Sequence, residues 1–153
     1  MKYIIPIIII AALLFYFFLP ASKDNDGSAK IERLLNNLVE SGVRKDINVV
    51  MEYFSPDYED PEGRTYPEIR DIIETAFERF EVIEGGYSNL IVSTTENENG
   101  ETETTANLDI WIKGIRSGSA YKLIGSQDNP QNIDIGFESI MFGGWKIIRV
   151  KKN

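Results

Sequence analysis

The sequence predicts an α+β protein, with an N-terminal transmembrane helix followed by about three helices packed on a curved antiparallel sheet. Three observations lead to this fold class. An uncharged apolar run, Tyr3–Pro20, opens the chain, apolar residues recur at helical spacing between residues 29 and 80, and apolar and polar residues alternate from Tyr87 onward. Because the helices precede the strands, we expect them to cover one face of the sheet.

Residues 1–21 are predicted to form an uncleaved signal anchor. A membrane-spanning helix needs about 20 apolar residues, and Tyr3–Ala21 covers roughly 28 Å at 1.5 Å per residue. Lys2 precedes the run, which favours an N-terminus inside the cytoplasmic membrane and a periplasmic or extracellular domain. The alternative is a secreted protein whose signal peptide is cleaved after Ala21, but this cut places Leu19 at an unfavourable position. Both interpretations export the domain.

Composition narrows the classes of partner and chemistry. The net charge of −8 disfavours binding to nucleic acid and to an anionic bilayer surface, because both would repel the chain. The absence of Cys excludes disulfides and thiolate chemistry. The absence of His excludes the commonest acid–base residue and every His-based triad or zinc site. We therefore expect no cofactor and no nucleic-acid partner.

A short polar linker, residues 22–28, is expected to lead into one domain over residues 29–153. Ser28 is predicted to cap the first helix and Gly42 to end it. Helical spacing predicts the buried face of this helix, formed by Ile31, Leu34, Leu35, Leu38 and Val39.

Two further helices are predicted from their capping residues. Asp46 is expected to cap a short helix that ends before Ser55-Pro56, and Thr65 and Glu68 have the spacing of a capping box before the third helix. Apolar residues recur along that third helix at i, i+3, i+4, i+7, i+8 and i+11, which predicts a buried face made of Ile69, Ile72, Ile73, Ala76, Phe77 and Phe80.

Alternation predicts the strands. The first is expected to begin at Tyr87 and to end at a turn over residues 96–100. Gly143-Gly144 is a strong signal for the last hairpin. In its final strand, Trp145, Ile147 and Arg149 are expected to share one face. The other strands are expected over residues 106–113, 121–126 and 133–141.

At this point the chain resembles the nuclear transport factor 2-like superfamily, also called the SnoaL-like or cystatin-like cone. The resembling residues are LLNNLVESGVRKDINVVMEYFSPDYEDPEG, PEIRDIIETAFERF and GFESIMFGGWKIIRV. The resemblance covers residues 29–150 and implies a cone-shaped domain with a pocket between the helices and the concave sheet. Members include isomerases, dehydratases, cyclases and binding or dimerisation modules, so the fold does not settle the function.

The resemblance implies pocket chemistry by Asp, Tyr and His, and this chain has no His to match the dehydratases. The catalytic candidates are Asp109 and Glu138 with Tyr53, because a carboxylate buried in the pocket would have a raised pKa and could act as a general base. Both carboxylates alternate with apolar residues, which favours a solvent-exposed position. The candidate residues for a ligand pocket are Tyr53, Tyr58, Tyr66 and Trp111.

An acidic loop follows the second helix. Its carboxylates, Asp57, Glu59, Asp60 and Glu62, offer the hard oxygen ligands that Ca²⁺ prefers. They lack the spacing of an EF-hand, and like charges in one loop are ordinarily solvated. We therefore expect a solvated loop and no metal site.

Two functions are consistent with these residues. The first is a non-enzymatic domain, tethered to the membrane, that binds a protein partner or a small apolar ligand, or that forms a homodimer through its sheet. The alternative is an isomerase-like or dehydratase-like enzyme with a carboxylate–tyrosine pocket. The missing His and the outward-facing carboxylates favour the first. A carboxylate buried in a cavity beside a Tyr hydroxyl would favour the second, and a pocket filled by aliphatic side chains would disfavour it.

Overall fold

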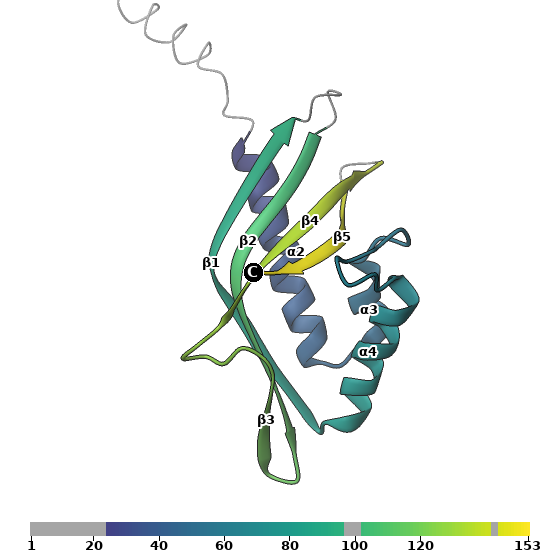
Figure 1. The fold of residues 1–153 in the computed structure, drawn as a ribbon, viewed down its shortest axis with the longest axis vertical. Helices are drawn as coiled ribbons and strands as arrows, with labels where there is room; N and C mark the ends of the chain where they lie inside the picture. Colours follow the sequence, from purple (N-terminus) through teal and green to yellow (C-terminus); the bar gives the residue numbers. More distant parts are fainter. Residues whose placement is uncertain (1–23, 97–101, 142–143) are drawn as a thin grey trace, which may run out of the picture.

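The computed structural model describes residues 24–96, 102–141 and 144–153 of the chain. Helices come first and strands follow, in the order that the sequence predicts (Figure 1). The helices are α2 (Asp24–Val43), α3 (Ile47–Glu52) and α4 (Tyr66–Arg79). The strands are β1 (Val82–Glu96), β2 (Thr102–Arg116), β3 (Ser119–Ile124), β4 (Gln131–Ile140) and β5 (Gly144–Lys152).

The strands form one antiparallel sheet with β2 at its centre. One side of β2 pairs with β1 from Val82↔Ile115 to Glu96↔Thr102. The other side pairs first with β4 and then, nearer its end, with the short strand β3. β5 pairs with β4. The long strands β1 and β2 curve, and the helices lie on one side of them (Figure 1). This confirms the predicted α+β class with helices on a curved sheet.

The core lies between the helices and the sheet face that they cover, which we call the inner face. Side chains from both layers are buried there, namely Ile31, Leu34, Leu35, Val50, Met51, Phe54, Tyr58, Ala106, Leu108, Ile133, Ile135, Phe137 and Ile147. The residues that alternate with them on the strands lie on the other face, which we call the outer face.

The predicted anchor, residues 1–21, lies outside the described residues, and none of the described helices is long and apolar enough to cross a membrane. Helix α2 begins at Asp24, within the stretch expected to be a linker. The prediction that Ser28 caps this helix is therefore wrong, because the helix continues through the polar residues before it. The expected stop at Gly42 is nearly right, since α2 ends at Val43.

The caps of α3 and α4 are confirmed. The Asp46 carboxylate accepts a hydrogen bond from the Val49 N–H at 3.2 Å, and the Glu68 carboxylate accepts one from the Thr65 N–H at 2.7 Å. The apolar face of α4 is less covered than its spacing predicts. No residue within α4 is fully buried, and Ile72 is 50% exposed. Only Phe80, just past its end, is buried.

Strand β1 begins at Val82, five residues before the predicted start at Tyr87. The alternation pattern did not reveal these first residues, because Gly85 and Gly86 have no side chains to alternate. A Cβ on Gly86 would lie 3.2 Å from the Trp111 indole nitrogen, so this glycine lets the indole lie against β1. The predicted turn over residues 96–100 lies, except for Glu96, outside the described residues.

A β-bulge in β5 corrects one predicted face. Gly136 pairs with Arg149, whereas the next residue, Phe137, pairs with Ile147, so Ile148 is the extra residue. The bulge moves Arg149 to the outer face, opposite to Ile147, where it forms an ion pair with Glu103. The prediction that Trp145, Ile147 and Arg149 share a face is thus wrong for Arg149. In the predicted last hairpin, Gly143 lies outside the described residues.

Candidate functional site

The carboxylate of Asp109 lies on the outer face, where two amide side chains hold it. Asn132 donates to one oxygen at 2.8 Å and Asn89 donates to the other at 2.7 Å. These bonds, the one from Asn132 first, lower the pKa of Asp109. A general base at this position would need the opposite shift, so the structure gives Asp109 the character of an ionised, anchored surface group.

Asp109 belongs to a ladder of hydrogen-bonded amide and carboxylate side chains that joins β2 and β4 on the outer face. Asn107 donates to Asp134 at 2.7 Å, and this hydrogen bond lowers the pKa of Asp134. Asn107 also donates to the Asn132 side chain at 2.9 Å. Sequence reasoning missed this ladder, because the residues of β2 and β4 become neighbours only through the register Asn107↔Asp134 and Asp109↔Asn132.

The other two catalytic candidates lie elsewhere. Glu138 pairs with Lys146 across β4 and β5, next to the inward-facing Phe137, and so lies on the outer face. Tyr53 follows the last turn of α3, where its carbonyl accepts a hydrogen bond from the Ile147 N–H at 2.8 Å. The fold therefore does not bring Asp109, Glu138 and Tyr53 together.

The aromatic candidates for a ligand pocket also lie in different parts of the fold. Tyr58 is buried and packs edge-to-face on Phe54 at 5.5 Å between ring centroids. The Tyr66 hydroxyl lies 3.5 Å from the Met51 carbonyl oxygen. Trp111 lies on the outer face of β2, with the Lys113 ammonium 5.9 Å from its ring centroid. Tyr53, Tyr58 and Tyr66 thus belong to the helical side, and Trp111 to the opposite face of the sheet.

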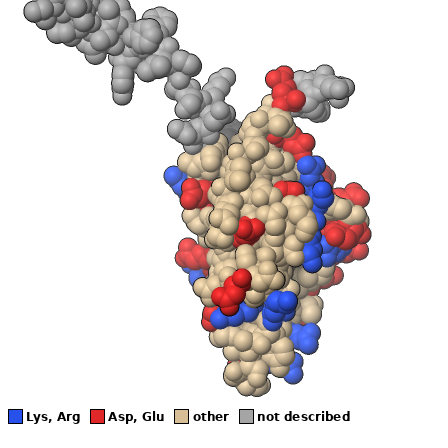
Figure 2. Space-filling view, turned by 60° about the vertical axis from the view of Figure 1, so that its left-hand side comes forward, with Lys and Arg blue, Asp and Glu red and all other residues tan. Residues whose placement is uncertain are grey.

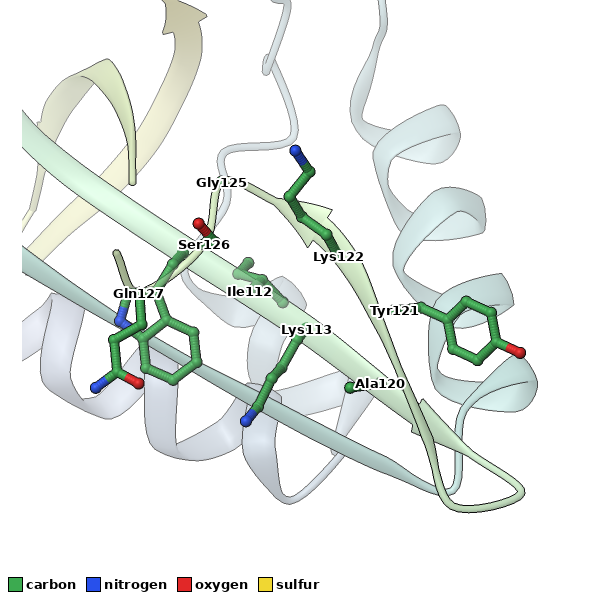
Figure 3. A pocket seen from close by; sticks show the side chains of 9 residues that line it. Ile112, Lys113, Ala120, Tyr121, Lys122, Gly125, Ser126 and Gln127 are labelled. Carbon is green, nitrogen blue, oxygen red and sulfur yellow. The ribbon is translucent and has the colours of Figure 1, made fainter. Parts of the chain in front are cut away.

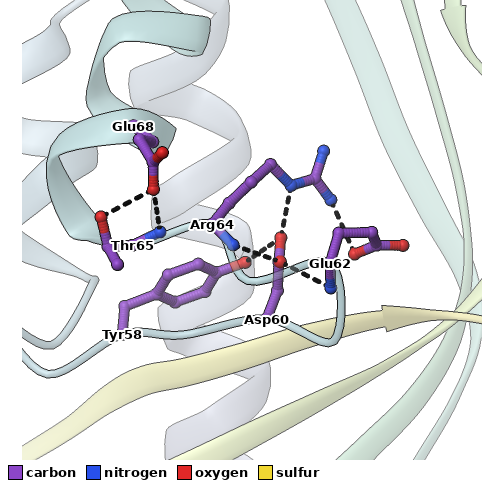
Figure 4. A network of polar contacts seen from close by, with 6 residues as sticks. All are labelled: Tyr58, Asp60, Glu62, Arg64, Thr65 and Glu68. Atoms are coloured by element: carbon purple, nitrogen blue, oxygen red, sulfur yellow. Dashed lines mark hydrogen bonds and ion pairs between the residues drawn. The ribbon is translucent and has the colours of Figure 1, made fainter.

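The acidic loop contains a buried carboxylate, Asp60, shown in Figure 4. Asp60 accepts hydrogen bonds from the backbone N–H groups of Glu62 at 3.0 Å and Arg64 at 2.9 Å. The Arg64 guanidinium donates to its second oxygen at 2.6 Å and forms an ion pair with Glu62 at 2.9 Å. Asp60 therefore closes the loop on itself, and the prediction of a fully solvated loop is wrong at this residue.

The contacts in this network shift the pKa values of Asp60 and Tyr58. Burial alone would raise the pKa of Asp60, but hydrogen bonds from Arg64 and its positive charge outweigh burial and lower it. Burial, with the nearby Asp60 charge, raises the pKa of Tyr58 well above its usual range. Asp60 is thus held ionised as a structural group. Among the described residues, no cluster of side chains is arranged to hold a metal ion.

A shallow pocket of about 250 Å³ lies between β2 and β3 (Figure 3). We call it the β2–β3 pocket, and it is lined by Trp111, Ile112, Lys113, Ala120, Tyr121, Lys122, Gly125, Ser126 and Gln127. Lys113 and Lys122 are paired across the two strands. Lys113 forms an ion pair with Glu84 at 2.8 Å. Apart from Trp111, no residue pattern in the sequence indicates this pocket, because the pocket depends on how β3 folds back on β2.

Gly125 shapes one wall of this pocket. Its φ is +50°, and a Cβ there would lie 2.6 Å from the Gln131 backbone nitrogen and 2.7 Å from the Ile110 carbonyl oxygen. Only glycine fits this close approach. The next residue, Ser126, starts a turn in which its N–H donates to the Asn129 carbonyl at 2.9 Å. The loop that carries Ser126 and Gln127 to the pocket is therefore held by backbone geometry.

Comparison with known proteins identifies the fold. No protein-family model and no curated protein matches the chain. Bd1075 of Bdellovibrio bacteriovorus is similar at 10% identity and a TM-score of 0.61, over 80% of this chain and 40% of that one. The chain thus spans about 40% of the length of that protein.

Two other solved structures match over most of both chains. One, from Novosphingobium aromaticivorans, is assigned as a scytalone dehydratase, with 16% identity and a TM-score of 0.66 over 82% of this chain and 81% of that one. The other, from Salmonella enterica, belongs to the nuclear transport factor 2-like superfamily, with 17% identity and a TM-score of 0.64 over 82% and 89%. At these identities the likeness shows the fold, which confirms the resemblance found in the sequence.

Proposed function

We propose that this nuclear transport factor 2-like domain is a non-enzymatic binding module for a protein partner, held at the outer side of the cytoplasmic membrane by Tyr3–Pro20. Two features of the molecule support this function. The packing of the domain argues against an internal reaction chamber, and the apolar run at the N-terminus has the length and composition of a membrane anchor.

The observation that carries the proposal is the apolar core packed between the helices and the sheet. Ala106, Leu108 and Ile135 of the inner face are buried against Ile31 and Met51 of the helices. A small apolar ligand or substrate at the position expected for the pocket would have to displace these side chains. Such displacement is costly, because protein interiors are close-packed. This packing disfavours both an internal ligand and an enzyme.

The carboxylates support the same conclusion. An isomerase or dehydratase of the expected kind needs a desolvated carboxylate with a raised pKa beside a Tyr hydroxyl. Asp109 is on the outer face with a lowered pKa. Asp60 lies 3.5 Å from the Tyr58 hydroxyl, but its pKa is also lowered and its oxygens already accept hydrogen bonds from Arg64 and Glu62.

The surface of the domain offers more for binding than its interior. Figure 2, which brings the β1 side of the molecule forward, shows a broad surface with few charged side chains. Ile91 and Val82 are exposed on the outer face of β1, and no described helix covers that face (Figure 1). An exposed sheet face with apolar side chains is a typical site for a second copy of the chain or for another protein.

Photo-crosslinking in cells tests the proposal. A photoreactive phenylalanine analogue at Ile91 should give a discrete adduct with another polypeptide, and the same analogue at the exposed Asp57 is the matched control. Adducts at both positions alike, or at neither, would contradict a binding surface on the sheet.

A reporter fused after Asn153 tests the tether separately. We expect an enzyme that is active only outside the cytoplasm to work in this fusion and to stay in the membrane fraction. Activity only of a cytoplasmic reporter would contradict the orientation. A soluble periplasmic or secreted product would show that the signal is cleaved.

A further inference from the structure

The described strands leave three sheet edges, and these edges differ in how they are protected against pairing with another strand. The edge of β5 is covered by the segment after α3, because the Ser55 N–H donates to the Ile147 carbonyl at 2.8 Å and the Glu59 N–H to the Ile148 carbonyl at 3.1 Å. Beyond this cover β5 carries Arg149, Lys151 and Lys152. Charged residues are a common device that blocks unwanted edge pairing.

The edge of β1 is interrupted instead. Its pairing with β2 shifts register between Ser88 and Ile91, and Asn89 has a φ of +54° in the middle of the strand. A bulge of this kind bends the strand and breaks the regular row of backbone groups that an incoming strand would need.

The third edge, that of β3, is not covered by another described segment. Its register shifts once, at Leu123, but the four residues 119–122 before this shift pair with β2 in regular register and so keep a regular row of backbone groups. β3 pairs only with β2 among the described strands, and all of its six residues are exposed. Three of them are large and apolar, with exposed fractions of 46% for Tyr121, 37% for Leu123 and 39% for Ile124. A single charged residue, Lys122, lies among them. An open, apolar edge strand is the structure to which an extended peptide adds by main-chain hydrogen bonds.

We infer that β3 is a docking edge for an extended segment of another protein that alternates apolar and acidic residues. The register defines the pattern. Tyr121 pairs with Gly114 on the inner side, where its ring lies 5.7 Å from Phe80, whereas Lys122 pairs with Lys113 on the outer side. An incoming strand would therefore present apolar side chains next to Tyr121 and acidic side chains next to Lys122, because side chains alternate between the two faces.

Charge selects this partner over a second copy of the chain. Antiparallel pairing of two β3 strands would bring Lys122 close to its own copy, and like charges facing each other across a strand pair are destabilising. Glu84 already pairs with Lys113, whereas Lys122 forms no ion pair with a described residue. An acidic side chain from the partner would supply the missing counter-charge at the β2–β3 pocket (Figure 3).

This inference adds a docking site at the β3 edge to the binding module proposed above, apart from Ile91 on the outer face of β1, and rests on that function. Its test uses the full chain in lipid nanodiscs and a short capped peptide that alternates valine with glutamate. Hydrogen exchange should slow at the amides of residues 119–124 when the peptide is added, because main-chain pairing protects them. Lys122→Glu should weaken binding about tenfold and should favour the matched peptide that alternates valine with lysine.

Lys152→Glu is the control, because it makes the same charge change on another strand, and its binding should equal that of the wild type. Peptide binding without protection of residues 119–124, or equal binding by Lys122→Glu, would overturn the inference but leave the binding function standing. Protection of residues 119–124 that rises with protein concentration alone would show a second copy as the occupant. Slowed exchange at buried positions such as Leu108 would point to an internal ligand and contradict the proposed function itself.

Discussion

Asp60 is the residue whose surroundings differ most from those that its neighbours in the sequence suggest. Its side chain is buried and accepts hydrogen bonds from two backbone N–H groups and from Arg64. We predict that Asp60→Asn lowers the free energy of unfolding by about 2–3 kcal/mol, because it removes the ion pair of the buried carboxylate with Arg64 and places an amide N–H₂ where donors converge. Urea denaturation measures this free energy of unfolding. Asp57→Asn, at an exposed position in the same loop, should change it by less than about 0.5 kcal/mol.

The contribution of Asp60 should depend on pH in one direction. Its pKa is lower in the folded state than in the unfolded chain, so the carboxylate stabilises the fold above the unfolded pKa. This stabilisation is lost as the pH falls through the lower, folded pKa. We therefore predict that the difference in unfolding free energy between the wild type and Asp60→Asn is full at pH 7 and shrinks below about pH 4. A difference that is the same at pH 7 and pH 3 would contradict this.

For single residues, the sequence predicts whether a side chain is exposed to solvent better than it predicts which groups that side chain contacts. Alternation with Leu108 correctly indicated that Asp109 faces away from the core. It gave no sign of Asn132, which is 23 residues away and meets Asp109 only through the register of β2 and β4. The burial of Asp60 was missed for a related reason. A row of acidic residues indicates solvation, and only the conformation of the loop shows that backbone N–H groups point at one of them.

Among the elements, the contact of α4 with the sheet depends on Gly114 in β2. A Cβ at this position would lie 2.3 Å from Cγ of Phe80, the buried residue that follows α4. We predict that Gly114→Ala lowers the free energy of unfolding by about 1–3 kcal/mol, because the ring or the strand must shift. Gly42→Ala is the control, since no atom lies within 4 Å of its Cβ position, and it should be neutral or slightly stabilising in α2. Thermal unfolding of both variants measures these changes in stability.

The C-terminal end of α4 is held by a lysine from another loop, the turn after α2. Lys45 has a φ of +57° in the turn after α2, and its ammonium donates to the carbonyl oxygens of Phe77 at 2.9 Å and Phe80 at 2.8 Å. A cation that bonds the last carbonyls of a helix stabilises its C-terminus. We predict that Lys45→Met speeds hydrogen exchange in the last turn of α4 several-fold. Arg44→Met, which removes only an exposed ion pair with Glu40, should leave exchange there unchanged.

Element types were predictable where the signal is local. Asp46 and Glu68 cap helices through residues only three positions away, so the sequence alone places α3 and α4. The start of β1 was not predictable, because Gly85 and Gly86 have no side chains to alternate, and their role depends on Trp111 from the next strand. The bulge at Ile148 likewise exists only in the register with β4, which periodicity within one strand does not reveal.

For the whole molecule, the order of helices and strands was enough to predict the fold, and the fold alone does not decide what the molecule does. Related folds surround different sites, so the state of the inner space matters more than the architecture. Here apolar side chains of the helices and the sheet pack together in a buried core at the centre of that space. Because of this packing, we propose that binding takes place at the surface, on the outer face and at β3, and not in the interior.

A methyl NMR titration with benzene tests this central claim most directly. We predict that the wild-type domain shows no saturable shift at buried methyl groups such as those of Ile31, Leu108 and Ile133. Ile135→Ala, which removes a buried side chain beside them, should open a cavity that benzene can enter, so its methyl groups should shift and saturate. This variant shows that the assay detects internal binding. Saturable shifts of the same methyl groups in the wild type would reveal an internal apolar pocket and contradict the account.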